Sequence, residues 1–171
     1  MRSSKFKRIR EQLQFCNISG GVWIDAGCGK GTYTLPLATL VSRVIAIDNN
    51  RSDISFLRAQ LPQKTNIIVS EKDFTKDVLS QDFVDGVLFG FSLHYQPNSI
   101  PALRNAFNHL KPNGSIIIFE YTRDKPLPWV PFPIPEIKLT ESLKKIGFRE
   151  IETIIQKRRF YVIHGKKVMK K

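Results

Sequence analysis

Short runs of apolar and β-branched residues recur along the chain and alternate with segments that have apolar residues at helical spacing. The runs are bounded by clusters of glycine, proline and polar residues, as is typical of buried strands. Nearly continuous apolar strands favour a parallel sheet that is covered by helices on both faces. Five strands are predicted before residue 120: Val22–Ile24, Val44–Ile47, Asn66–Val69, Val84–Phe89 and Ser115–Phe119.

The segments around these strands predict helices. Phe6, Ile9 and Leu13 fall at helical spacing, so we expect an amphipathic helix within residues 1–19. The connection between the third and fourth strands is short and has room for a turn or two of helix at most. Four further helices are predicted, the last closed by a glycine: Thr32–Leu40, Ser52–Gln60, Ile100–Leu110 and Glu136–Ile146.

The C-terminal part of the sequence predicts two more strands, Phe148–Ile155 and Phe160–His164. The tight, basic segment Gln156–Arg159 joins them, which implies an antiparallel pair. The predicted fold class is therefore α/β, with a doubly wound, mainly parallel sheet of seven strands and a C-terminal antiparallel strand. In this arrangement the Gln156–Arg159 turn lies at the carboxyl edge of the sheet.

Length and composition suit one domain. A chain of 171 residues with 42% apolar content can bury a sufficient core, so we expect a single domain over residues 1–171, with its core in residues 20–165 and a basic tail at 166–171. The sequence has no apolar run of about 18 residues and no apolar secretory segment, which predicts a cytoplasmic protein without membrane attachment. Cys16 and Cys28 do not have metal-ligand spacing, so no metal site is predicted.

The net charge of +12 comes from the two ends of the chain. Residues 1–10 hold five Lys and Arg, residues 157–171 hold seven, and neither segment has an acidic residue. Between them, 15 basic and 15 acidic residues cancel, so the body has no general attraction for phosphate backbones. We interpret the terminal cations as solvated surface charge, with a nucleic-acid-binding arm as the alternative.

A glycine-rich turn follows the first predicted strand, where Asp25–Thr32 reads DAGCGKGT. A strand that enters such a turn before a helix lets a nucleotide approach bare backbone. A phosphate-binding P-loop is excluded because Lys30 is followed by Gly31, and a dinucleotide fingerprint is weakened because Thr32 stands at its third glycine. The remaining pattern is Asp-x-Gly-x-Gly-x-Gly.

Three further positions extend this pattern. Asp48 ends the second strand about 20 residues after the glycines, where a carboxylate can accept ribose hydroxyls. Asp73 and Phe74 follow the third strand, and Leu110–Ser115, LKPNGS, leads into the fifth. With these motifs the chain resembles the class I S-adenosylmethionine-dependent methyltransferases over about residues 20–165. Asn113 replaces a glycine of that family, a mild departure because asparagine tolerates turn conformations.

The resemblance implies S-adenosylmethionine as the cofactor and methyl transfer as the activity. It assigns the glycine loop to the amino acid end of the cofactor, Asp48 to the ribose, and Asp73 with Phe74 to the adenine. Asp25 either binds the cofactor's ammonium through water or braces the turn. The expected cofactor-binding residues are Asp25, Gly27, Cys28, Gly29, Gly31, Thr32, Asp48, Asn49, Asp73, Phe74, Gly90, Phe91 and Ser92.

The residues after the fourth strand stand where the methyl group emerges in the resembling family. His94 is the candidate for removing an acceptor proton and Tyr95 for orienting the acceptor. The alternative is a purely structural histidine, which we favour slightly because the sequence shows no partner for it. An Asn/Asp-Pro-Pro-Tyr/Phe element is absent here, which disfavours methylation of adenine in DNA. The candidates for an acceptor pocket are Glu120, Tyr121, Trp129 and Phe132.

Several classes of acceptor and function stay open. The neutral body and the short loop Pro126–Pro135 favour a small molecule. RNA or a ribosomal or translation protein is the second hypothesis, motivated by the basic segments. A non-catalytic S-adenosylmethionine-binding module is the third, and a nicotinamide oxidoreductase ranks last. The sequence does not predict an oligomeric state.

Overall fold

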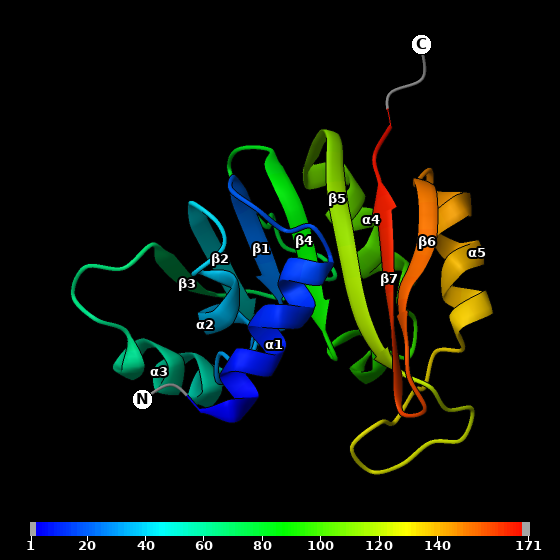
Figure 1. The fold of residues 1–171 in the computed structure, drawn as a ribbon, viewed down its shortest axis with the longest axis horizontal. Helices are drawn as coiled ribbons and strands as arrows, with labels where there is room; N and C mark the ends of the chain where they lie inside the picture. The colour runs from blue at the N-terminus through cyan, green and yellow to red at the C-terminus, as the bar shows by residue number, and fades with distance from the viewer. Residues whose placement is uncertain (1–2, 169–171) are drawn as a thin grey trace.

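The computed structural model describes residues 3–168, which form one seven-stranded sheet in the order β3-β2-β1-β4-β5-β7-β6 (Figure 1). All neighbouring strands are parallel except that β7 runs antiparallel to both β5 and β6. The predicted α/β class and C-terminal antiparallel strand are thus confirmed. The strands are β1 (Val22–Ala26), β2 (Arg43–Asp48), β3 (Ile67–Glu71), β4 (Val84–Gly90), β5 (Leu110–Tyr121), β6 (Arg149–Gln156) and β7 (Phe160–Lys166).

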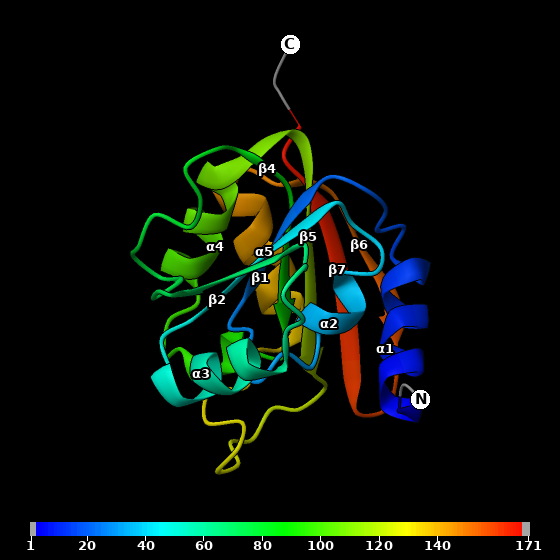
Figure 2. The ribbon, with the colours of Figure 1, turned by 90° about the vertical axis from the view of Figure 1, so that its left-hand side faces the viewer.

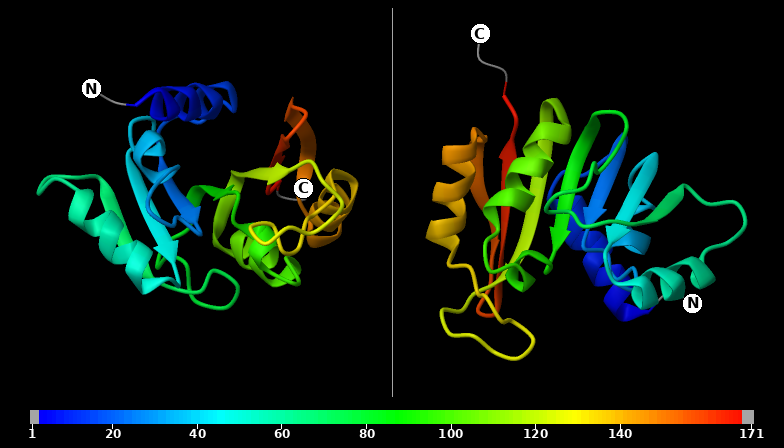
Figure 3. Two further views of the ribbon diagram at one scale, coloured as in Figure 1. Left: turned by 90° about the horizontal axis from the view of Figure 1, so that it is seen from below. Right: turned by 180° about the vertical axis from the view of Figure 1, so that it is seen from behind.

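Helices cover both faces of the sheet, as Figures 2 and 3 show from the side and from below. One core cluster holds the buried residues of the first three helices, and the other holds those of the last two. No helix lies between β3 and β4, in agreement with the short connection. The helices are α1 (Ser4–Phe15), α2 (Thr34–Leu37), α3 (Arg51–Gln60), α4 (Ile100–His109) and α5 (Glu136–Ile146), with a 3-10 turn η1 (Leu93–Tyr95).

The second helix is shorter than predicted. The expected helix Thr32–Leu40 is reduced to α2, Thr34–Leu37. Pro36 supplies no backbone N–H for the helix. After Pro36 the hydrogen bonds span three residues, as in a 3-10 turn: the N–H groups of Thr39 and Leu40 donate to the carbonyls of Pro36 and Leu37 at 3.1 and 2.9 Å.

The strand order reverses at β1, which lies between β2 and β4. In doubly wound sheets, ligands bind at the carboxyl ends of the strands beside such a switch point. The segments that leave β1, β2 and β4 there are the glycine loop, the Asp48 turn and the Gly90–Tyr95 segment. The sheet therefore brings the predicted motifs to one edge.

The C-terminal hairpin places its turn at that same edge, because Phe160 pairs with Tyr121 at the end of β5. The predicted location of the Gln156–Arg159 turn is correct. The predicted tail 166–171 is partly wrong: Lys166 is the last residue of β7, and Nζ of Lys167 donates to the carbonyl oxygen of Leu110 at 2.8 Å. Residues 169–171 of that tail lie outside the described residues.

No helix within residues 3–168 has the length and apolar character needed to cross a membrane.

Candidate functional site

The glycine loop after β1 packs tightly on one side and is open on the other. Gly27 has φ +77°, and a Cβ there would lie 2.4 Å from Cβ of Ser92. A Cβ on Gly29 would meet only Oδ2 of Asp53 within 4 Å, at 3.9 Å. The loop therefore needs glycine for packing at position 27 and presents bare backbone to open space at position 29.

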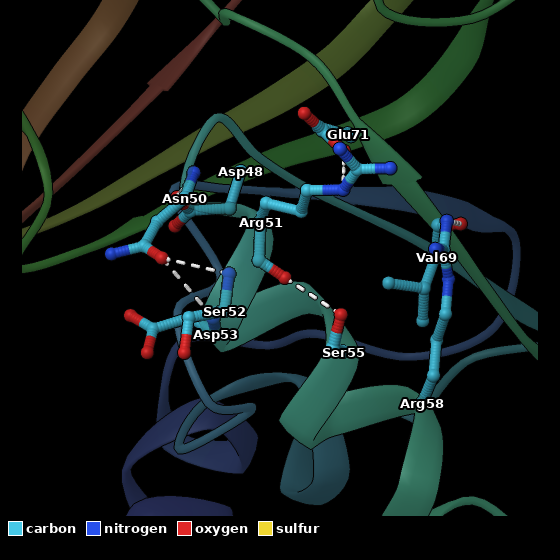
Figure 4. A network of polar contacts seen from close by, with 9 residues as sticks. All are labelled: Asp48, Asn50, Arg51, Ser52, Asp53, Ser55, Arg58, Val69 and Glu71. Atoms are coloured by element: carbon cyan, nitrogen blue, oxygen red, sulfur yellow. Dashed lines mark hydrogen bonds and ion pairs between the residues drawn. The ribbon is translucent and has the colours of Figure 1, made fainter.

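Asp48 ties this loop to the start of α3. Its Oδ2 accepts a hydrogen bond from the backbone N–H of Gly29 and its Oδ1 accepts one from that of Asn50, both at 2.8 Å. The Asn50 side chain in turn caps α3 by accepting from Ser52 and Asp53 (Figure 4). Each carboxylate oxygen keeps a lone pair for a further donor, such as a ligand hydroxyl.

Asp25, at the end of β1, is 1% exposed. Its Oδ2 accepts from the Thr34 hydroxyl at 2.6 Å, whereas Oδ1 has no hydrogen-bond partner among the described residues. Burial raises the pKa of Asp25 to about 7. The hydrogen bond from Thr34 acts to lower this pKa, and the negative charge of Asp48 acts to raise it. The loop thus carries a buried acid with one unsatisfied oxygen.

These residues line a cavity of about 640 Å³. Eleven of the thirteen predicted cofactor-binding residues are in its wall. Gly31 does not line the cavity, because it packs against Leu57. Asp73 does not line it either, because its Oδ1 accepts hydrogen bonds from the Thr75 backbone N–H at 2.9 Å and from the Thr75 hydroxyl at 2.6 Å. The wall residues that the sequence analysis missed are Lys30, Tyr33, Asn50, Asp53 and Gln96, most of them direct neighbours of predicted ones. Tyr95, the residue predicted to orient the acceptor, is also in this wall.

A second cavity of about 850 Å³ adjoins the first. It contains the predicted residues His94, Tyr95 and Tyr121 in its wall. The two cavities have five wall residues in common: Thr32, Tyr33, Gly90, Phe91 and Tyr95.

His94 and Glu120 form a buried pair beside this second cavity. Nδ1 of His94 lies 2.9 Å from Oε2 of Glu120, and both side chains are 1% exposed. Oε1 of Glu120 accepts from the backbone N–H of His94 at 3.2 Å. Nε2 of His94 has no hydrogen-bond partner within residues 3–168. The prediction that Glu120 lines an acceptor pocket is therefore wrong: it positions His94 instead.

Two other predicted pocket residues, Trp129 and Phe132, do not line either cavity. They are 59% and 43% exposed, in the loop that connects β5 to α5. Near its C-terminal end the backbone of this loop is held by hydrogen bonds from the Phe132 N–H to the His94 carbonyl at 3.0 Å and from the Tyr161 hydroxyl to the Ile134 carbonyl at 2.6 Å. The loop thus contacts the site through its backbone, not through these aromatic rings.

The second cavity also contains residues that the sequence analysis did not assign to a site. Four come from α1 and four from the β6–β7 turn and the start of β7. No local signal in the sequence predicts that these two segments, about 150 residues apart, meet at one cavity. They are Lys5, Arg8, Ile9, Gln12, Lys157, Arg158, Arg159 and Phe160.

Comparison with known proteins identifies the family. Residues 24–118, more than half of the chain, match the model of the methyltransferase domain family, and the chain belongs to that family. Ubiquinone biosynthesis O-methyltransferase of Rickettsia typhi is 30% identical over 115 residues, which are 67% of this chain and 46% of the relative. The chain thus spans about half the length of the curated relatives that it matches.

Solved structures share the whole fold. An S-adenosylmethionine-dependent methyltransferase from Aquifex aeolicus superposes with a TM-score of 0.79 and 20% identity, over 98% of this chain and 100% of that one. A 1,6-didemethyltoxoflavin-N1-methyltransferase from Burkholderia thailandensis, solved with bound 1,6-didemethyltoxoflavin and S-adenosylhomocysteine, has a TM-score of 0.74 and 18% identity over 97% of this chain and 79% of that one. The predicted family, its fold and S-adenosylmethionine as its cofactor are confirmed.

The first cavity fits this cofactor by its chemistry. The unsatisfied Oδ1 of Asp25 is an acceptor for an ammonium or for a water bound to it. The open backbone at Gly29 admits a close approach, and Asp48 keeps acceptor capacity for hydroxyls. These three residues would hold polar ends of the cofactor.

Proposed function

We propose that the protein transfers a methyl group from S-adenosylmethionine, bound in the first cavity, to a small molecule bound in the second. The shared wall of the two cavities carries this proposal, because a cofactor and an acceptor that fill them meet at Thr32, Tyr33, Gly90, Phe91 and Tyr95. The names of relatives support a small acceptor: they include ubiquinone biosynthesis and demethylmenaquinone methyltransferases.

When bound, the cofactor supplies a methyl group on a sulfonium, an activated electrophile that needs mainly an aligned nucleophile in a site that excludes water. The chain's own contribution is therefore chiefly positional. Gly90 and Phe91, at the end of β4, and Tyr33 form the boundary at which the two ligands face each other. The ring of Phe91 packs on that of Tyr121 with a centroid separation of 4.6 Å, which keeps this boundary apolar.

His94 is the proposed proton acceptor. The carboxylate of Glu120 accepts the hydrogen on Nδ1, which leaves the lone pair of the neutral imidazole on Nε2. Nε2 is buried at the wall of the second cavity, so it takes the proton that the acceptor's oxygen or nitrogen loses on methylation once binding of the acceptor opens a path to it. The rings of Tyr95 and Tyr121 lie 4.4 and 5.3 Å from the imidazole and flank it. Glu120 is a positioning residue in this scheme.

The cofactor site is tested by calorimetric titration of the protein with S-adenosylmethionine, S-adenosylhomocysteine and NAD. We expect both sulfur compounds to bind and NAD not to bind. The Asp48→Ala variant should bind S-adenosylhomocysteine at least about ten-fold more weakly, because it loses the carboxylate that holds Gly29 and Asn50. Asp124→Ala, an exposed acid outside both cavities, is the matched control. Preferential binding of NAD would contradict the proposal.

The acceptor class is tested by incubating the protein with methyl-labelled S-adenosylmethionine and separate metabolite, RNA and protein fractions. Label should enter the metabolite fraction. His94→Asn should lower that rate by about 10²-fold or more and leave the affinity for S-adenosylhomocysteine unchanged. Label in RNA or protein alone would replace the small-molecule acceptor by a macromolecule.

A further inference from the structure

Five cationic residues line the second cavity. Two of them, Lys5 and Arg8, come from α1, and the other three, Lys157, Arg158 and Arg159, form the β6–β7 turn. The wall of this cavity contains no aspartate or glutamate. Parts of the two basic segments, which the sequence analysis interpreted as solvated surface charge, therefore meet at one site.

None of these five side chains forms a hydrogen bond or an ion pair with any other residue in the described range 3–168. Other cations of the chain do have partners: Lys111 pairs with Asp85 at 2.8 Å and Lys166 with Glu150 at 2.6 Å. Cations gathered without counter-charges create a local positive potential that attracts and holds an anion. The cavity is therefore electrostatically suited to a negatively charged ligand.

The rest of the wall is largely aromatic. The ring of Phe91 contacts three other rings, with centroid separations of 4.6 Å to Tyr121, 6.0 Å to Phe160 and 6.1 Å to Tyr33. Such surfaces accommodate a flat apolar body. The cavity thus combines an aromatic region and a cationic region.

We propose that the acceptor is a small planar molecule that carries a carboxylate or phosphate group, which Arg8 and the Lys157–Arg159 turn bind. This inference rests on the proposed function and names the class of its substrate. None of the five cations belongs to the wall shared with the first cavity. The methyl group therefore goes to an atom of the planar body, and the anionic group only orients the molecule.

The distribution of charge favours a small anion over RNA. An RNA strand needs cations along a track that follows several phosphates. Outside the two basic segments, residues 11–156 carry 15 basic and 15 acidic residues and supply no excess of positive charge. Five cations of the two basic segments instead line a cavity that also offers aromatic rings to a single ligand.

The test is calorimetric titration with 2-naphthoate, 2-naphthyl phosphate and the neutral 2-naphthamide, each with and without S-adenosylhomocysteine. We expect at least one of the two anions to bind at least about ten-fold more tightly than the amide, because a charge-assisted contact is worth this much in a partly desolvated site. The tighter of the two anions distinguishes a carboxylate from a phosphate site. Equal affinities for all three compounds, or no binding of either anion, would overturn the proposal.

Two double variants separate this site from the effect of net charge. Arg8→Gln with Arg158→Gln should abolish the preference for the anion and leave the binding of the amide and of S-adenosylhomocysteine unchanged. Arg104→Gln with Lys138→Gln removes the same charge from exposed positions on α4 and α5 and should keep the preference. If both double variants lose the preference for the anion equally, the proposed anion site is rejected. The site is also rejected if mixed transfer RNA displaces the bound anion at a low molar ratio. Circular dichroism checks that both variants are folded.

The outcomes also separate this inference from the proposed function. Failure of S-adenosylhomocysteine to bind, with the anion preference intact, rejects the function and keeps the anion site. Binding of S-adenosylhomocysteine without any anion preference keeps the cofactor site and rejects the anionic acceptor.

Discussion

Nδ1 of His94 and Oε2 of Glu120 lie 2.9 Å apart in a fully buried pair that joins the segment after β4 to the end of β5. Removing the carboxylate leaves a buried ring N–H and the His94 backbone N–H without an acceptor. We expect Glu120→Ala to lower the free energy of unfolding by about 2–4 kcal/mol and Glu120→Gln by less, since the amide still accepts one hydrogen bond. Urea denaturation measures this difference, and Glu141→Ala, on the exposed side of α5, should change it little.

The buried acid Asp25 makes stability depend on pH. Because burial raises its pKa to about 7 from the ordinary 3.8, the folded chain keeps this proton at pH values where the unfolded chain has lost it. The stability that the protonated group confers is complete below pH 4 and is lost as the pH rises through 7. The free energy of unfolding of Asp25→Asn, measured by urea denaturation relative to that of the wild type, should therefore rise by up to about 4 kcal/mol between pH 4 and pH 8. A constant difference would show that Asp25 titrates normally.

Asp85 should behave in the opposite way. Burial acts to raise its pKa, but hydrogen bonds from Lys111 and from the Val22 N–H, with the charge of Lys111, hold the pKa below its ordinary value. The stabilising effect of a carboxylate with a lowered pKa is present above the unfolded pKa and disappears as the pH falls through the folded one. Asp85→Asn should therefore destabilise the protein at pH 7 and have little effect at pH 2–3. The same denaturation series measures both variants.

Gly20, before β1, and Gly27, in the glycine loop, allow a comparison between backbone strain and steric overlap. Gly20 and Gly27 both have positive φ, +62° and +77°, but a Cβ at Gly20 meets nothing within 4 Å whereas one at Gly27 meets Ser92 at 2.4 Å. Gly20→Ala should cost about 1 kcal/mol of stability, the strain alone. Gly27→Ala should cost at least about 2 kcal/mol more and should also weaken binding of S-adenosylhomocysteine. Equal costs would mean that the loop moves away from Ser92 freely.

The Tyr161 hydroxyl supplies one of the hydrogen bonds that hold the loop between β5 and α5. Tyr161 is 1% exposed, and its hydroxyl donates to the Ile134 carbonyl at 2.6 Å. We expect Tyr161→Phe to lower the free energy of unfolding by about 1 kcal/mol and to speed amide exchange in residues 122–135. Tyr95→Phe, at a 54% exposed ring without a recorded hydroxyl partner in the described part of the chain, is the stability control. Unchanged exchange in the loop would assign its order to the Val130 side chain instead.

The pattern of the sequence predicts the sheet, and it predicts most of the residues that meet in the wall of the first cavity, because both depend on local features. Apolar runs mark the strands, and parallel strands bring their carboxyl ends together, so the glycine loop, Asp48 and Phe74 meet in one wall. Asn113, predicted to tolerate a turn, has φ +64°. The wall of the first cavity thus follows from short segments and the order of the strands.

The second cavity is harder to predict because it depends on packing between distant segments. The partner of His94 is 26 residues away on the neighbouring strand, and its identity requires the register of β4 and β5. The approach of α1 to the hairpin turn depends on how Ile9 and Leu13 pack in the core cluster that also holds Val162. Arg8 and Arg158 are 150 positions apart in the sequence, although both line one cavity. Periodicity carries no information about such contacts.

The two cavities also differ in when they can be completed as the chain is synthesised. Residues 25–96 supply the entire wall of the first cavity, whereas the second joins residues 5–12 to residues 157–160. The order of translation therefore places the wall residues of the first cavity well before the last ones of the second. A nascent chain that has emerged through β5 already contains the whole wall of the first cavity, but the second cavity is complete only when the final hairpin closes beside α1.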